Sequence, residues 1–195
     1  MISAEPKKLL LHIGRARSIL RRYLITNGFD GALTMLGLMV GFHSSQRVDL
    51  AVALSACMGA AIALFMSGLS SAYLSESAER KKELGELEQA MIADLKETEY
   101  GEASRYLPLI VALVNGVSPM LISLLIMLPL WLAAFGMALP FSPFLAAIAI
   151  ALVLLFLLGM FLGSIGRTFW LWAGLQTLAI AVLTVAIVLI VNTTF

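Results

Sequence analysis

Residues 24–42 read LITNGFDGALTMLGLMVGF, an apolar stretch with a single charged residue, Asp30. A helix needs about 20 residues to cross the hydrocarbon core of a bilayer, so this stretch is long enough to span a membrane. A carboxylate at that depth costs roughly 3 kcal/mol on insertion scales and usually faces a bundle interior or a hydrated path. The stretch therefore predicts a membrane helix with a functional acid.

The composition agrees with a membrane protein. The chain of 195 residues is 61% hydrophobic and 13% charged, with a mean hydropathy of +0.97. A soluble domain would need more polar surface. A net charge of +1 supports no nucleic-acid partner, and the single cysteine, Cys57, excludes an internal disulfide framework.

Dividing the apolar stretches by length predicts an all-α, polytopic membrane protein with five transmembrane helices. Residues 1–23 carry basic residues among short apolar runs and predict a cytoplasmic amphipathic helix that binds membrane lipids. An acidic cytoplasmic helical segment, residues 75–105, separates helices 1–2 (24–74) from helices 3–5 (106–195). The five predicted spans are about 24–42, 48–74, 106–134, 141–165 and 168–191.

The positive charges predict the orientation. Five spans put the N-terminus, residues 75–105 and the turn after the fourth span on one side, which holds twelve of the thirteen Lys and Arg residues. Only Arg47 lies opposite. The positive-inside rule therefore places the N-terminus in the cytoplasm and the C-terminus outside, in the plasma membrane if the organism is prokaryotic.

The first span has one small and polar face. At 100° per residue, its members fall within about 80° of one another; they are Thr26, Asp30, Thr34, Gly37 and Gly41. One interpretation is that this face packs against another helix, with Asp30 hydrogen-bonded there. The other is that Asp30 lines a path for ions, with soft ligands from Met35, Met39 or Met66.

Two further regions are candidates for function. In the third span, Pro119 frees a carbonyl near Asn115, which predicts either a broken helix beside a cavity or a simple kink. The cytoplasmic segment holds nine of the twelve acids. Glu79, Glu83 and Glu86 share a helical face that could collect divalent cations, whereas the alternative is an ordinary solvated helix. No catalytic constellation is present, so we expect no enzyme and no cofactor.

Residues 30–41, DGALTMLGLMVG, resemble the first-span pattern Asp-Gly-Leu-x-Thr-x-x-Gly-Leu-x-x-Gly of the vacuolar iron transporter family. Further along the chain, Tyr73-Leu74-Ser75 is similar to the family's Glu-Tyr-Leu-Ser motif. Arg80 with Glu83 and Glu86, in the segment that follows, is similar to the family's Arg-Glu-x-x-Glu run. The third, fourth and fifth spans continue the resemblance in order, at LLIMLP (124–129), LGMFLGS (158–164) and GLQ (174–176).

The resemblance implies a homodimer that moves Fe²⁺ or Mn²⁺ out of the cytoplasm in exchange for protons, with Asp30 as the path carboxylate. The divalent metal is then the transported substrate. Two departures keep an alternative open: Ala72 stands where the family has a glutamate, and the cytoplasmic insertion is short. The alternative is a non-transporting membrane scaffold whose acidic helix docks a partner.

Overall fold

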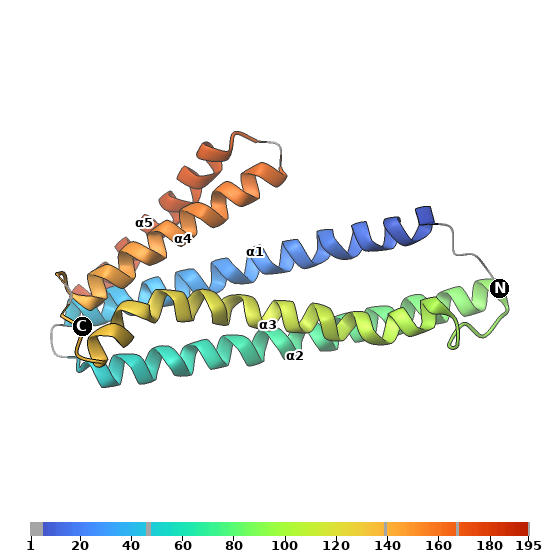
Figure 1. Cartoon of the computed structure of the whole chain (residues 1–195), viewed down its shortest axis with the longest axis horizontal. Helices are drawn as coiled ribbons and strands as arrows, with labels where there is room; N and C mark the ends of the chain where they lie inside the picture. Colours follow the sequence, from blue (N-terminus) through green and yellow to red (C-terminus); the bar gives the residue numbers. More distant parts are fainter. Residues whose placement is uncertain (1–5, 46–47, 139, 167, 195) are drawn as a thin grey trace.

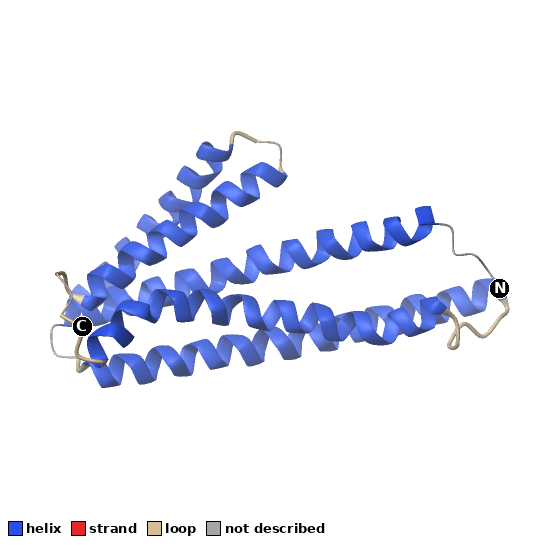
Figure 2. Ribbon diagram, viewed as in Figure 1, coloured by secondary structure: helices blue, strands red, loops and turns tan. Residues whose placement is uncertain are grey.

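The computed structural model describes residues 6–45, 48–138, 140–166 and 168–194, with side chains described from Arg21 onward. Within these residues the chain forms five helices, and each contains a stretch long and apolar enough to cross a membrane (Figure 2). They are α1 (Pro6–Ser45), α2 (Leu50–Met91), α3 (Glu99–Ala134), α4 (Pro143–Ile165) and α5 (Trp170–Thr194). The prediction of an all-helical chain with five apolar helices is confirmed.

The first three helices are longer than the predicted spans. α1 runs without a break through the predicted boundary at residue 23, and α2 continues from its apolar part to Met91. At 1.5 Å per residue, these 40- and 42-residue helices extend roughly 60 Å, twice the thickness of a hydrocarbon core. The acidic segment is therefore mainly a continuation of α2 and the start of α3 rather than a separate pair of helices.

A compact turn joins α2 to α3. Ile92 ends α2 in the left-handed region, at a φ of 51°, and Glu88 accepts a hydrogen bond from the backbone N–H of Leu95 at 3.0 Å. Asp94 accepts from the backbone N–H of Lys96, and this bond lowers the pKa of Asp94, with help from the Lys96 ammonium group. Thr98 then caps α3 by accepting from the backbone N–H of Gly101 at 3.3 Å.

Figure 1 shows the arrangement of the helices: α2 and α3 run antiparallel along their length, α1 lies beside them, and the α4–α5 hairpin diverges from α1. α2 packs mainly against α3, and α1 packs against α3, α4 and α5 but makes little contact with α2. All five helices contribute to a core at one end of the bundle, which includes Met35, Cys57, Met127, Leu155 and Ala181.

Glycines allow the closest helix approaches. A Cβ added to Gly31 of α1 would lie 2.6 Å from the carbonyl oxygen of Pro119 in α3, and one added to Gly68 of α2 would lie 2.8 Å from that of Asn115. In lipid, helices associate mainly through close packing and interhelical hydrogen bonds. These two contacts therefore fix how α1 and α2 sit on α3.

We expect Gly31→Ala to destabilise the protein by about 1–3 kcal/mol, because the added methyl group meets backbone atoms that cannot rotate away. Gly85→Ala is the matched control, since a Cβ there meets nothing within 4 Å. Reversible unfolding in mixed micelles measures both variants. Equal stability of the two variants would contradict the close α1–α3 contact.

Candidate functional site

Asp30 lies on the face of α1 that is turned away from the core. Asp30 and Thr26 are exposed, whereas Thr34, Gly37 and Gly41 are partly exposed. The opposite side of the same helix is buried and carries Met35, Leu36 and Met39. The structure therefore separates the small and polar side of α1 from its buried apolar side. Among the described residues, no other helix covers Asp30.

No hydrogen bond or ion pair within the described part of the chain involves Asp30. The interpretation in which Asp30 is bonded to another span of the same chain is therefore wrong for these residues. The glycines of this face differ in their surroundings: a Cβ at Gly41 would meet nothing within 4 Å, whereas one at Gly37 would lie 3.9 Å from Val188 of α5. Among the described residues, α5 therefore borders the face at Gly37, and Asp30 and Gly41 are left open to contact from outside the chain.

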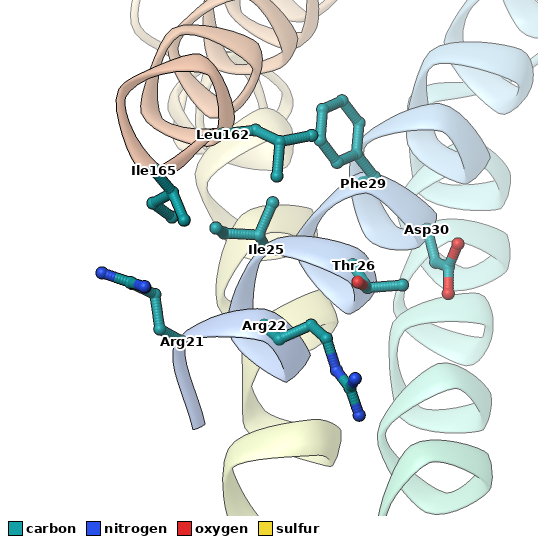
Figure 3. Close-up of a pocket in the computed structure, with 8 residues that line it drawn as sticks. All are labelled: Arg21, Arg22, Ile25, Thr26, Phe29, Asp30, Leu162 and Ile165. Carbon is teal, nitrogen blue, oxygen red and sulfur yellow. The ribbon is translucent and has the colours of Figure 1, made fainter. Parts of the chain in front are cut away.

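A pocket of about 480 Å³ lies between α1 and the C-terminal end of α4. Asp30 is at its rim and points away from the α4 side chains, whereas Arg21 extends toward them (Figure 3). The residues that line the pocket are Arg21, Arg22, Ile25, Thr26, Phe29, Asp30, Leu162 and Ile165. Its charged residues are Arg21, Arg22 and Asp30, and the two arginine side chains extend in opposite directions, with Arg22 on the side of α1 that carries Thr26 and Asp30 (Figure 3).

The predicted methionine ligands are divided between two environments. Met35 and Met39 are completely buried in the core, on the side of α1 away from Asp30. Met66 of α2 is 53% exposed. In a single chain, therefore, neither Met35 nor Met39 accompanies Asp30, and Met66 is the methionine that remains open to a partner.

The predicted acidic face is partly neutralised by Arg80. Arg80 forms ion pairs with Glu76 at 3.5 Å and with Glu83 at 2.6 Å. Tyr100 of α3 also donates to Glu83, at 3.5 Å. Glu86 lies 3.9 Å from Lys82, and Glu79 is exposed. In the described residues, no three His, Cys, Asp or Glu side chains are placed to hold a metal ion.

A polar network joins three helices beneath this surface. Asn27 of α1 donates to the side-chain oxygen of Asn115 in α3, and Asn115 in turn donates to the carbonyl oxygen of Gly68 in α2 at 2.6 Å. Ser118 donates to the carbonyl oxygen of Leu24 at 2.6 Å. α3 continues through Pro119 without a break, so the broken helix considered from the sequence is wrong.

Two features were absent from the sequence prediction. One is the bond between Tyr23 and Glu76, at 3.2 Å, which ties α1 to the start of the charged part of α2. The other is the partial burial of Arg80, whose Nε atom is buried without a hydrogen-bond partner in the described structure. The spacing of Arg80, four residues after Glu76 and three before Glu83, could have indicated its ion pairs. No local sequence signal indicated the bond between Tyr23 and Glu76.

These observations define the class of the protein: an all-helical chain with five helices apolar enough to cross a membrane and an uncovered carboxylate on the first. Among known proteins, the uncharacterized protein MJ0645 of Methanocaldococcus jannaschii is similar to it. The two are 29% identical over 162 residues, which cover 81% of each chain. No family model and no solved structure matches the chain.

Proposed function

We propose that the protein is an integral membrane transporter that exports divalent transition-metal ions, Fe²⁺ or Mn²⁺, from the cytoplasm in exchange for protons. Its N-terminus and the α2–α3 connection lie in the cytoplasm, and its C-terminus lies outside. The distribution of basic residues supports this orientation. The observation that carries the transport proposal is the position of Asp30, a lone acid in an apolar stretch that the rest of the chain leaves uncovered.

The depth of Asp30 supports its role. It lies six residues after Leu24, which corresponds to roughly 9 Å along the helix from the start of the apolar stretch. A carboxylate facing lipid at that depth is costly, so some other group must face it. A proton and a metal ion compete for the same oxygens, and protonation from outside would release the metal.

A second copy of the chain is the partner we propose for this face. Two α1 helices can approach closely along Thr34, Gly37 and Gly41, because small residues permit close backbone contact. The resulting homodimer brings two Asp30 carboxylates toward a shared path. The exposed Met66 is available to such a path, whereas Met35 and Met39 become ligands only if the core opens.

The route to Asp30 runs along this face and not through the pocket beside α4. Arg21 and Arg22 stand at the pocket's end nearest the cytoplasm, and their positive charges oppose the entry of a divalent cation. Glu79 is the member of the acidic face that remains open to collect cations, since Glu83 is held by Arg80 and Glu86 lies 3.9 Å from Lys82.

We expect Asp30→Asn to abolish metal-driven proton flux in proteoliposomes, because the amide neither ionises nor carries a proton to exchange. Asp49→Asn is the control: Asp49 is also exposed, and it lies just before α2 with no capping bond from its side chain. Insertion of both variants is checked by their resistance to carbonate extraction. Normal flux in the Asp30 variant would reject its assignment as the path carboxylate.

We expect a cysteine at Thr34 to cross-link two copies in the membrane, because Thr34 lies one helical turn from Asp30 on the proposed contact face. The background is Cys57→Ala, which removes the native thiol. Leu125→Cys on the exposed side of α3 is the control and should not form a cross-link. Equal cross-linking at the two positions, measured over a series of lipid dilutions, would contradict the dimer.

The scaffold alternative has one specific observation in its favour. Ala72 is buried between α2 and α3, beside Val111 and Ala112, in place of the glutamate that the iron transporter resemblance predicts. A carboxylate at this position would be enclosed by apolar side chains. In this alternative, the charged end of α2 docks another protein and no ion moves.

Thermal unfolding with added Fe²⁺, Mn²⁺, Zn²⁺ or Ca²⁺ separates the two functions. We expect Fe²⁺ or Mn²⁺ to raise the melting temperature, because binding to the folded state at 100 times Kd adds about 2.7 kcal/mol. The increase should be smaller in Asp30→Asn. A flat response to all four ions would favour the scaffold.

A further inference from the structure

The pocket between α1 and α4 is left unexplained by metal transport. Arg21 and Arg22 are neighbours at the start of the apolar part of α1, and no ion pair among the described residues involves either of them. The guanidinium group of Arg22 lies 5.6 Å from the centre of the Tyr23 ring. Two positive groups without a carboxylate partner create a local preference for an anion.

The rest of the pocket wall is apolar. Ile25, Phe29 and Ile165 line the pocket. Ile25 is buried, whereas the side chains of Phe29 and Ile165 are partly exposed. Leu162 is 48% exposed on α4. The α4–α5 hairpin diverges from α1 (Figure 1), and the pocket lies between α1 and the C-terminal end of α4. A ligand that fits must combine an anionic group with a hydrocarbon chain.

The position of the arginines agrees with such a ligand. They lie two and three residues before Leu24, where the apolar stretch begins, which is the level of the lipid phosphates in the orientation proposed above. Basic pockets between helices on the cytoplasmic side are suited to anionic lipid headgroups. Asp30, eight residues beyond Arg22, is roughly 12 Å deeper and so does not compete for the arginines.

We infer that this pocket binds one anionic phospholipid of the cytoplasmic leaflet. Its phosphate contacts Arg21, the neighbouring Arg22 adds positive charge nearby, and an acyl chain follows Ile25 and Phe29 on one side and Leu162 and Ile165 on the other. The lipid joins α1 to α4 through the residues that line this pocket. This inference rests on the proposed membrane orientation but not on metal transport.

Native mass spectrometry of the purified protein, titrated with phosphatidylglycerol, tests the charge contribution. We expect the double variant Arg21→Gln/Arg22→Gln to bind this lipid roughly 30-fold more weakly, at about 1 kcal/mol for each basic residue near a phosphate. Arg105→Gln is the matched control, because Arg105 is exposed on α3 at the same end of the molecule. Phosphatidylcholine should bind weakly to every variant. Equal binding of the two lipids, or an equal loss in the control, would overturn the inference.

A second variant tests the apolar wall without changing charge. Leu162→Trp fills the pocket and should weaken phosphatidylglycerol binding several-fold, whereas Leu157→Trp, at 48% exposure on another face of α4, should not. Glycerol phosphate tests whether the headgroup alone suffices, and binding as tight as that of the lipid would show a soluble-phosphate site instead. Asp30→Asn should retain lipid binding, so loss of transport and loss of the lipid are distinguishable.

Discussion

Inside a hydrocarbon layer, a polar group must find its partner within the protein, because water is absent and an unsatisfied group costs several kcal/mol. Most of the buried polar side chains obey this constraint. Asn115 connects Asn27 to the backbone of Gly68, and Thr177 of α5 donates to the carbonyl oxygen of Leu155 in α4 at 3.0 Å. Such bonds join helices whose apolar surfaces alone would have no preference over lipid.

Asp30 is the exception to this constraint, and for that reason we propose that it carries the function. Its helix meets α3 so closely at Gly31 that the carboxylate one residue earlier is turned to the outside of the bundle. The side of α1 that packs inward holds large apolar side chains, and the outward side holds small or polar ones. A protein that needed only a packed bundle would gain nothing from a carboxylate there. In the proposed dimer, a second chain and a cation facing Asp30 resolve the conflict between its charge and its surroundings.

Much of this could be predicted from the sequence, because apolar length and the 100° helical period are strong local signals. They located the five apolar helices, with the ends of α4 and α5 correct to within a few residues, and they separated the face of Asp30 and Thr34 from the core, but α1, α2 and α3 extend beyond the predicted spans. The same period also places Met35 about 140° from Asp30, so its burial away from the acid was available from the sequence. The continuity of α1 and α2 could not be predicted from the sequence, because a polar helix and an apolar helix can join without any sequence signal.

What the sequence could not supply are pairings over long distances. Asn27 and Asn115 are 88 residues apart in the sequence. Arg21 and the C-terminal end of α4 are also distant in the sequence, and folding brings them to the same pocket. In the orientation proposed above, Arg21 and Arg22 stand at the membrane boundary and Asp30 lies deeper along α1. The proposed metal ion at Asp30 and the proposed lipid phosphate at Arg21 approach different sides of this helix. Under both proposals, a shift of α1 during transport also moves the lipid site, which gives the membrane a physical means of influencing the ion path.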